Sequence, residues 1–386
     1  MPAGRFRSQP APRGGGPARA PVRRLTLSFG GPVSLELTPY RLRLREPLLT
    51  ARGPLLERVG TRITLKGEDG ISGEGDAAPF PGLGATIEEV NAALEAYGRG
   101  EAAFETLPYE ARSALEGARL DQESRRRFQS LSGYLAGLAG LAGHLRGLRV
   151  PVHALVQTPE QAVVALRTGF RTLKLKVGAA SIADDVARIY AVRQAVGPAI
   201  RIRLDANRAW SLTEAISALS QLREVSPDFI EEPVKAGQAA FRELAGLGVA
   251  LAVDESAISD LDFESALSRA EVAVVVLKPS FCGGPLVALR RGLAAVESGK
   301  RVVVTSVLES AIGRLAALHV AALFPFEAAG HPATEAAGHP ATEAAGHPAT
   351  EAAGLEGPFE TDLAPFPETL DGSLEVPAGP GLWARA

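Results

Sequence analysis

Five charged residues in the middle of the chain each close a short run of apolar, largely β-branched residues. They are Lys176, Asp205, Glu231, Asp254 and Lys278, and neighbours in this series lie 23 to 29 residues apart. That spacing accommodates one strand and one helix each time. A repeated strand–helix unit with a charged residue at the end of each strand predicts a (β/α) barrel with its active site on the C-terminal face. The predicted fold class is therefore α/β.

Seven barrel strands are clear in the pattern, and the barrel begins near Pro151. The expected strands are 152–157, 172–177, 200–205, 228–231, 249–254, 272–278 and 301–306. The expected helices are 159–168, 181–196, 213–224, 238–246, 260–269, 285–298 and 311–323. An eighth strand is expected after Gly354, which makes a (β/α)7β TIM-like barrel.

An N-terminal α+β capping domain is predicted before the barrel. Residues 25–64 alternate as strands do, and GISGEGDAAPFPGLG reads as a turn-rich stretch. Helices are expected in ATIEEVNAALEAYG and across about 108–147. The predicted organisation is a disordered basic tail, the cap, the barrel and a C-terminal segment that returns to the cap, with bounds 1–24, 25–147, 148–360 and 361–386.

Bulk composition describes an ordinary globular protein. The chain has 386 residues, 46% of them hydrophobic, a net charge of −3 and one cysteine, Cys282. No apolar run approaches the roughly 20 residues of a membrane span. Residues 1–24 carry six arginines but no apolar core of a secretory signal. We expect a cytoplasmic protein that has no membrane span and does not bind nucleic acid; a basic arm for nucleic acid or anionic lipid is the alternative for the tail.

An eight-residue sequence, EAAGHPAT, is repeated three times without change over residues 327–350. We call it the octamer. Its composition offers little to bury, although it contains His331, His339 and His347. A metal-binding histidine array is one interpretation. The simpler one is a repeat-expanded loop that joins the seventh barrel helix to the eighth strand, on the face opposite the chemistry.

The three carboxylates Asp205, Glu231 and Asp254 end consecutive predicted strands. Adjacent parallel strands lie about 4.8 Å apart, so the three side chains should converge. Carboxylates this close repel one another unless a cation lies between them. All-oxygen ligands favour Mg²⁺, with Mn²⁺ as the next choice. Any one of these acids could equally be a helix cap or part of an ion pair. The set of three at this spacing predicts a metal site.

Lysines flank the carboxylates in the predicted barrel. In TLKLK, Lys174 and Lys176 share one face of the strand, and the leucines share the other. The next strand repeats the pattern with Arg201 and Arg203, which indicates a charged lumen rather than a solvated edge. Lys278 lies across the ring. Two amines beside a metal-bound carboxylate can remove a proton and stabilise the charge that results.

Several motifs together resemble the muconate-lactonizing subgroup of the enolase superfamily. They are LKLKVG, RLDANRAW, FIEEP, VDES, LKPS with GG following, and TSVLES. The likeness covers about residues 28–325 and resumes at AAGLEGPFETDL. Within the subgroup, RLDANRAW and SVLES are most similar to o-succinylbenzoate synthases of menaquinone biosynthesis. The chain departs from that pattern at Gly354–Gly357, where a threonine is missing.

The resemblance implies a role for each matched residue. Lys176 would remove the α-proton and return it to the leaving hydroxyl, and Lys278 would stay protonated. The metal ligands would be Asp205, Glu231 and Asp254. Supporting and substrate-binding roles would fall to Lys174, Asn207, Thr305 and Ser306. Cap segments 48–58 and 79–85 would close over the site.

Three functions remain open from the sequence. The first is a lyase, the Mg²⁺-dependent syn-dehydration of a succinyl-cyclohexadiene carboxylate to 2-succinylbenzoate. The second is an N-acylamino-acid racemase or dipeptide epimerase on the same scaffold, although no Asp-x-Asp occurs near 352–362. The third is a non-catalytic binding protein on a degraded barrel. The first two predict a small-molecule carboxylate substrate, and the oligomeric state stays open.

Overall fold

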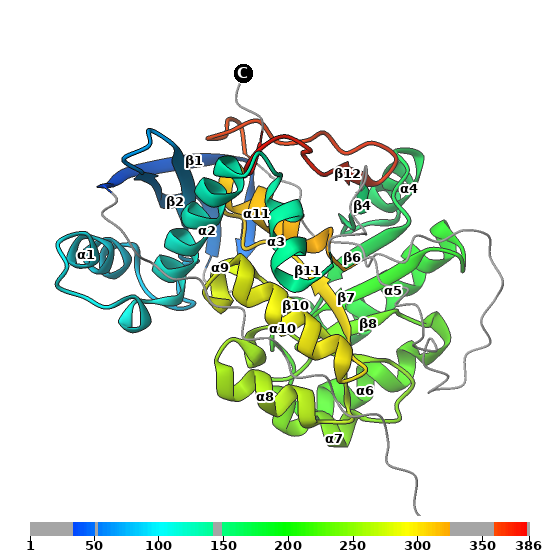
Figure 1. The fold of residues 1–386 in the computed structure, drawn as a ribbon. Helices are drawn as coiled ribbons and strands as arrows, with labels where there is room; N and C mark the ends of the chain where they lie inside the picture. Colours follow the sequence, from blue (N-terminus) through cyan, green and yellow to red (C-terminus); the bar gives the residue numbers. More distant parts are fainter. Residues whose placement is uncertain (1–33, 51–52, 142–148, 325–358, 384–386) are drawn as a thin grey trace, which may run out of the picture.

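The computed structural model describes residues 34–50, 53–141, 149–324 and 359–383. The chain forms an α+β cap, drawn blue to cyan in Figure 1, beside a larger α/β domain drawn green to yellow. This is the predicted fold class. The basic tail, the octamer repeat and the expected eighth strand after Gly354 lie outside the described residues.

The cap is an antiparallel sheet covered by helices. Its strands are paired in the order β1-β2-β3. Ile63 and Leu65 of the sheet pack against Val90 and Leu94 of the first helix, whose start is fixed by a capping box at Thr86. The elements are β1 (Ser34–Thr50), β2 (Gly53–Lys66), β3 (Ser72–Ala77), α1 (Ile87–Gly98), α2 (Tyr109–Arg126) and α3 (Leu131–Ala139).

The prediction of a turn-rich stretch over residues 70–84 is wrong in its first half, because β3 occupies it. Gly73 and Gly75 lie there against α2. A Cβ on Gly73 would approach the carbonyl oxygen of Ala118 to 2.0 Å, and one on Gly75 would approach that of Ala114 to 1.9 Å. These glycines allow a helix to pack directly on a strand, which is a different use from turning the chain.

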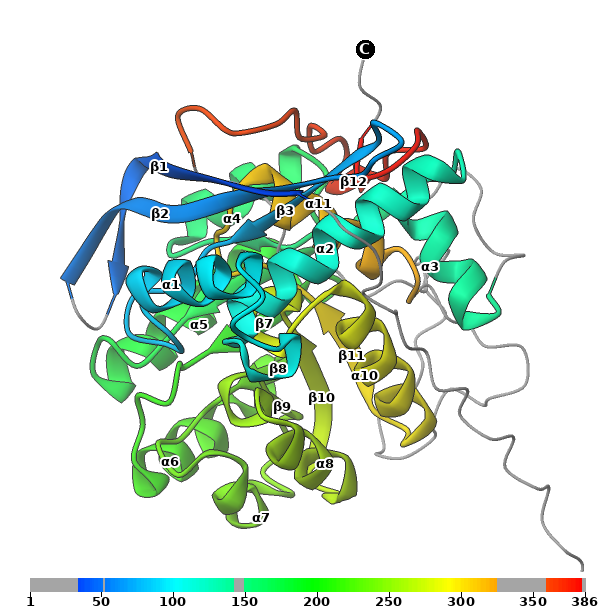
Figure 2. The same cartoon turned by 60° about the vertical axis from the view of Figure 1, so that its left-hand side comes forward.

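The hairpin of β1 and β2 also extends further than predicted. Pairing continues past a register shift to Leu48 opposite Leu55 and Leu49 opposite Pro54. The described residues of the expected closing segment 48–58 are therefore part of a two-stranded ribbon. The long ribbon crosses the top of the molecule in Figure 2.

The larger domain is a curled, parallel seven-stranded half-barrel with order β11-β10-β9-β8-β7-β6-β5. All seven predicted strands and the alternating helices are confirmed, with ends shifted by a few residues. The strands are β5 (Ala154–Leu155), β6 (Thr172–Lys176), β7 (Arg201–Asp205), β8 (Phe229–Glu231), β9 (Leu251–Val253), β10 (Val272–Leu277) and β11 (Arg301–Val304). The helices are α4 (Pro159–Arg167), α5 (Ile182–Val196), α6 (Leu212–Leu222), α7 (Phe241–Leu244), α8 (Asp260–Ser268), α9 (Pro279–Cys282), α10 (Pro285–Glu297) and α11 (Ala311–Ala321).

The two faces of the curled sheet have different cores. Leu173 and Leu175 face outward and pack with the helices. A separate cluster fills the inside, formed by Phe229, Ala252, Val274, Val276 and Val303. The alternation of TLKLK therefore sends its lysines inward, as the strand pattern predicts.

Arg203 belongs to the inward set but not to the strand tips. It is fully buried, its Nε donates to Asp228 at 3.0 Å, and Arg301 donates to the other oxygen of that carboxylate at 2.6 Å. In IRIRLD, Arg203 thus belongs to a buried ion pair, whereas Asp205 lies at the C-terminal edge of the sheet.

The C-terminal segment contacts both domains. Strand β12 (Ser373–Glu375) pairs antiparallel with β4 (Arg149–Pro151). Further on, the backbone N–H of Leu382 donates to Asp121 of α2 at 2.7 Å. In the described part of the chain no helix is both long and apolar enough to cross a membrane.

Candidate active site

The tips of three adjacent strands form one row of charged residues. Lys176, Asp205 and Glu231 lie opposite one another in the register of β6, β7 and β8. Asp254 directly follows β9, and Lys278 directly follows β10. The structure therefore brings the five residues singled out in the sequence to the same edge of five consecutive strands.

Lys174 lies below this row and joins two of the carboxylates. Its Nζ is 2.9 Å from Asp205 Oδ2 and donates to Glu231 Oε2 at 2.7 Å. Burial opposes the charged form of Lys174, but these two carboxylates outweigh it and hold its pKa above the ordinary value. Burial likewise opposes the charged form of Asp205, and the charges of Lys174 and Lys176 reverse that effect, so its pKa lies below the usual range.

Lys278 forms a buried ion pair with Asp254. Burial disfavours the ammonium, yet Asp254, Glu231 and Glu255 together hold the pKa of Lys278 well above its ordinary value. For Asp254, burial raises the pKa; Lys278 opposes the rise, whereas the nearby Glu255 and Glu231 add to it. Burial is therefore the main reason why the pKa of Asp254 is raised, and the neighbouring acids add to it.

Lys176 is the most accessible amine of the three lysines, with 39% of its side chain exposed against 11% for Lys174 and 15% for Lys278. Its Nζ donates to Asn207 Oδ1 at 2.5 Å and to Asp205 Oδ2 at 3.4 Å. The other end of the Asn207 amide donates to Glu255 at 3.1 Å. An amine can only donate and a carboxylate can only accept, so this chain of contacts fixes which way the amide faces.

The adjacent acids Glu231 and Glu232 have different surroundings. Glu232 is fully buried, and its Oε1 accepts the backbone N–H of Asp254 at 2.8 Å and that of Ser256 at 2.7 Å. Its Oε2 accepts from Arg208 at 3.1 Å. Glu231 instead has one oxygen, Oε1, that is buried with no hydrogen-bond partner.

A divalent cation fits this donor set. Within the described ranges, no three His, Cys, Asp or Glu side chains already stand in metal-ligand geometry. The carboxylates of Asp205, Glu231 and Asp254 turn to the lysines instead. Glu231 Oε1 and Glu255 Oε2 are nevertheless buried without partners, which is costly unless a cation or water satisfies them. Oxygen donors of this kind suit Mg²⁺ or Mn²⁺.

Two further predicted residues follow the last described barrel strand. The N–H of Thr305 donates to the carbonyl oxygen of Leu277 at 2.9 Å, which continues the pairing of β11 with β10. Thr305 is buried, and Ser306 is partly exposed. Both lie at the C-terminal edge of the sheet, as the site residues do.

Sequence reasoning did not assign three polar residues beside the row. They are Glu232, Glu255 and Arg208. A signal exists for the two acids, because each directly follows a predicted ligand, in IEEP and in VDES. Nothing in the sequence alone says that Arg208 pairs with Glu232, since the contact depends on loop backbones with positive φ at both residues.

Comparison with known proteins places the chain in a family. The model of the family "Enolase C-terminal domain-like" matches residues 157–383. An o-succinylbenzoate synthase of Thermobifida fusca is 37% identical over 182 residues, which cover 46% of this chain and 56% of that protein. A hydrophobic dipeptide epimerase of Enterococcus faecalis is 34% identical over 171 residues, 42% of this chain and 47% of that protein. The chain thus spans about half the length of these two relatives in the matched stretches.

Solved structures of low sequence identity have the same fold. The dipeptide epimerase of Enterococcus faecalis in complex with Mg and the dipeptide L-Leu-L-Tyr gives a TM-score of 0.75 at 23% identity, over 91% of this chain and 98% of that one. The muconate lactonizing enzyme of Pseudomonas putida gives 0.72 at 21% identity, over 91% and 96%. The family model, which matches more than half of the chain, identifies the chain as a member of the enolase C-terminal domain-like family.

Proposed function

We propose that the protein is an o-succinylbenzoate synthase, which removes water from a succinyl-cyclohexadiene carboxylate with Mg²⁺ as cofactor. The observation that carries the proposal is the difference between the two lysines that flank the acids. Lys176 is 39% exposed and reachable, whereas Lys278 is held as a cation by Asp254. A syn-dehydration needs one lysine that moves a proton and a second that stays charged.

Each residue then has a separate task. Lys176 removes the proton next to the substrate carboxylate and afterwards delivers it to the departing hydroxyl on the same face, so that one side chain is base and then acid. Lys278 faces the negative charge that develops and does not exchange its proton. Asn207 holds the amine of Lys176 in position through its 2.5 Å contact. Asp205, Glu231 and Asp254 would hold Mg²⁺, which when bound neutralises charge on the substrate carboxylate.

A dipeptide epimerase is the second candidate, favoured by the 34% identity with the enzyme of Enterococcus faecalis. An epimerase of the muconate-lactonizing subgroup would need an acid for the substrate amine near the last strand. Asp362, an acid of that stretch, is committed elsewhere: it accepts the N–H of Ala311 at 2.7 Å and pairs with Arg314. This commitment supports dehydration over epimerisation.

A paired assay separates the two candidates. The purified protein with Mg²⁺ is given the dehydration substrate, and the loss of diene absorbance is followed. In parallel it is given L-Ala-L-Glu in D₂O, and deuterium at the α-carbon of the second residue is measured by proton NMR. Dehydration without exchange supports the synthase. Exchange of the dipeptide without dehydration would reject it in favour of the epimerase.

A further inference from the structure

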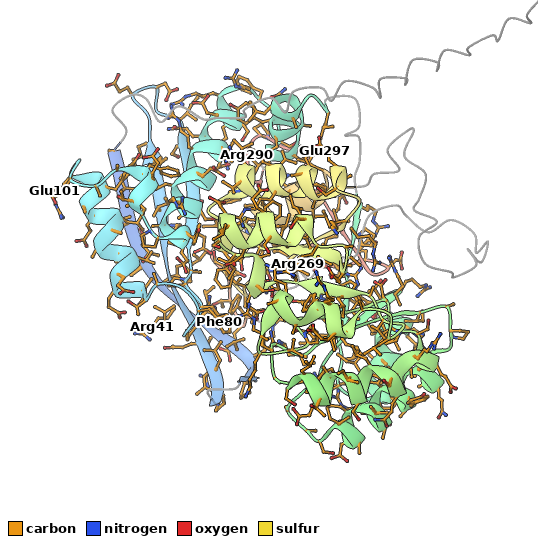
Figure 3. The ribbon with its side chains drawn as sticks, turned by 90° about the horizontal axis from the view of Figure 1, so that it is seen from below. Arg41, Phe80, Glu101, Arg269, Arg290 and Glu297 are labelled. Carbon is orange, nitrogen blue, oxygen red and sulfur yellow. The ribbon has the colours of Figure 1, made fainter. Side chains whose placement is uncertain are left out.

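Arg58 is an almost fully buried arginine of the cap, 1% exposed, on β2. Its guanidinium donates to the carbonyl oxygens of Ala78 and Pro79, both at 2.9 Å, and to that of Leu308 at 3.0 Å. It also lies over the ring of Phe80, 4.9 Å from the centroid. Figure 3 shows Phe80 where the cap strands face the barrel. One side chain therefore joins a loop of the cap to the loop between β11 and α11.

A second tie joins the same parts of the molecule. Asp76 of β3 accepts the backbone N–H of Ser310 at 2.8 Å and its hydroxyl at 2.6 Å, and it also accepts the hydroxyl of Tyr40 at 2.7 Å.

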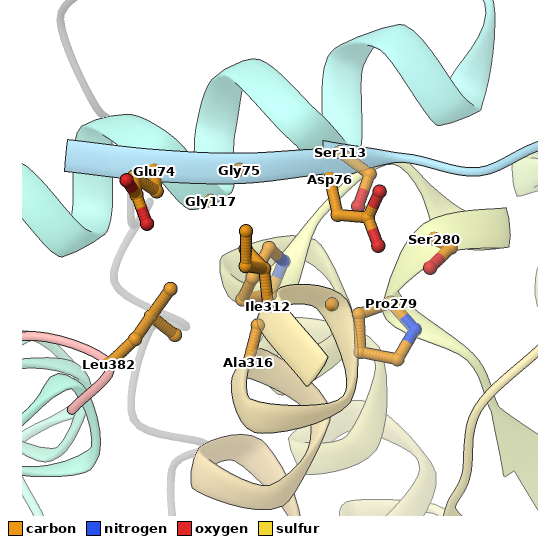
Figure 4. A pocket seen from close by; sticks show the side chains of 12 residues that line it. Glu74, Gly75, Asp76, Ser113, Gly117, Pro279, Ser280, Ile312, Ala316 and Leu382 are labelled. Atoms are coloured by element: carbon orange, nitrogen blue, oxygen red, sulfur yellow. The ribbon is translucent and has the colours of Figure 1, made fainter. Parts of the chain in front are cut away.

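The same loop also contacts the barrel next to the charged row. Ser280, in the short helix directly after Lys278, donates to Glu309 at 3.2 Å. Figure 4 shows Asp76 of β3 directed toward the barrel elements that carry Pro279 and Ser280.

Two features of these contacts between cap and barrel are energetically unfavourable: the burial of Arg58 and the backbone conformation of Leu308. Burial disfavours the charged guanidinium and lowers the pKa of Arg58, although Tyr40, Glu309 and Asp76 partly oppose this effect. Leu308 has a φ of 61°, a left-handed conformation that a leucine adopts only when its surroundings hold it there. Leu308 lies in the loop that follows β11, at the edge of the sheet where the charged row lies, and Arg58 contacts that loop through the carbonyl oxygen of Leu308.

We propose that Arg58, together with Asp76, is a positioning residue of the active site: it fixes the cap loop at residues 78–80 against the β11–α11 loop, and the two loops together hold the end of the substrate remote from the lysines. Arg58 itself is too deeply buried to touch a substrate, so it acts through the three carbonyl groups. The proposal rests on the proposed function only for the identity of the substrate.

The test combines a structural measurement with kinetics in Arg58→Lys and Asp76→Asn. Lysine keeps the charge, but its donors all lie on one nitrogen and cannot reproduce bonds that three separate guanidinium nitrogens make to three carbonyl groups. Asparagine is nearly isosteric with aspartate. Hydrogen exchange, measured without substrate, should become about tenfold faster in peptides covering residues 78–80 and 305–310 together, and stay unchanged in β6 and β7. The KM for the dehydration substrate should rise about tenfold while kcat changes less than about threefold.

Arg41→Lys is the matched control. Arg41 is an exposed arginine of the same hairpin, paired with Glu57, and Figure 3 shows it on the outer side of the cap. It should leave exchange and KM unchanged. Unaltered exchange in Arg58→Lys, acceleration in only one of the two segments, or a fall in kcat at constant KM would each overturn the proposal. If Arg58→Lys does not fold, Asp76→Asn decides by the same criteria. A wild type that dehydrates nothing refutes the proposed function alone, because the exchange measurement still decides whether the two loops are tied.

Discussion

The carboxylate of Glu232 accepts the backbone N–H of Asp254 at 2.8 Å. A buried acid on one strand tip thus sets the position of an acid on the next. Glu231, its neighbour in sequence, presents an oxygen with no partner to the same region. Of the two consecutive glutamates, one organises the backbone of the site and the other is available to a cation.

Glu231→Gln should lose most of the Mg²⁺ affinity, because its oxygen Oε1 is buried without a hydrogen-bond partner and is the one available to a cation. The metal-free protein should lose some stability as well, since Oε2 of Glu231 pairs with the buried amine of Lys174 at 2.7 Å. Stabilisation by metal should therefore shrink from the roughly 2.7 kcal/mol expected at 100 times the dissociation constant. Thermal unfolding with and without Mg²⁺ measures both effects.

Glu232→Gln should weaken Mg²⁺ binding less than Glu231→Gln does, because both oxygens of Glu232 already accept hydrogen bonds. An amide cannot replace a carboxylate that accepts two backbone N–H groups and an arginine, so the metal-free protein should lose about 1–3 kcal/mol of stability. Equal effects of the two substitutions on metal binding would mean that Glu231 is not the ligand.

Exhaustive chelation should abolish turnover, and Mg²⁺ or Mn²⁺ should restore it. Without a cation, Lys278 is the one amine assigned to the charge that develops on the substrate carboxylate, and three acids lie next to that charge. The measurement is the rate of diene loss after EDTA treatment and after titration back with each metal. Full activity in the chelated protein would refute the metal assignment.

Lys176→Ala should lower the dehydration rate by at least about 10²–10⁴-fold, the usual contribution of one general acid–base group. Lys278→Arg should retain more activity than Lys278→Ala, because the guanidinium preserves the positive charge beside Asp254. Steady-state kinetics of the three variants give the answer. If arginine is as inactive as alanine at position 278, proton transfer by Lys278 matters, and the epimerase gains support.

The sequence predicts the row of charged residues well because the strand register is set by hydrophobic alternation. In TLKLK the leucines must face the helices, so the lysines can only face the lumen. The role of Lys174 follows less directly. Its bridge between Asp205 and Glu231 depends on side-chain reach across three strands, which the sequence does not specify.

The cap was harder to predict for a physical reason. Glycine normally indicates a turn, but Gly73 and Gly75 are needed for the close approach of α2 to β3. The pattern of one segment cannot report a contact with a helix that begins more than thirty residues later. The contacts of Arg58 cannot be predicted from the sequence either, because they are made to backbone carbonyl oxygens, which every residue has.

Two buried groups that do not belong to the charged row should give protein stability opposite dependences on pH. His319 of α11 is fully buried, and burial lowers its pKa from 6.5 to about 4. Because the unfolded chain binds the proton more tightly, the contribution of His319 is fully present above pH 6.5 and is lost as the pH falls toward 4. The full difference is about 3 kcal/mol.

Glu116 of α2 caps the start of α10 through the N–H of Leu286 at 2.7 Å, and burial raises its pKa from 4.5 to about 7. Here the folded protein binds the proton more tightly. Stability is therefore lost as the pH rises from 4.5 to 7, again by about 3 kcal/mol. Between pH 4.5 and 6.5 the contributions of His319 and Glu116 to the free energy of unfolding change in opposite directions, so they largely cancel in the wild type.

Single substitutions should reveal the two contributions. The stability advantage of the wild type over His319→Gln should grow as the pH rises from 4 to 6.5. Glu116→Gln should instead gain on the wild type as the pH rises from 4.5 to 7, since glutamine carries no charge to bury. Urea unfolding at a series of pH values measures both difference curves. Curves that slope the same way relative to the wild type would contradict the assignment of either His319 or Glu116 as a buried titrating group.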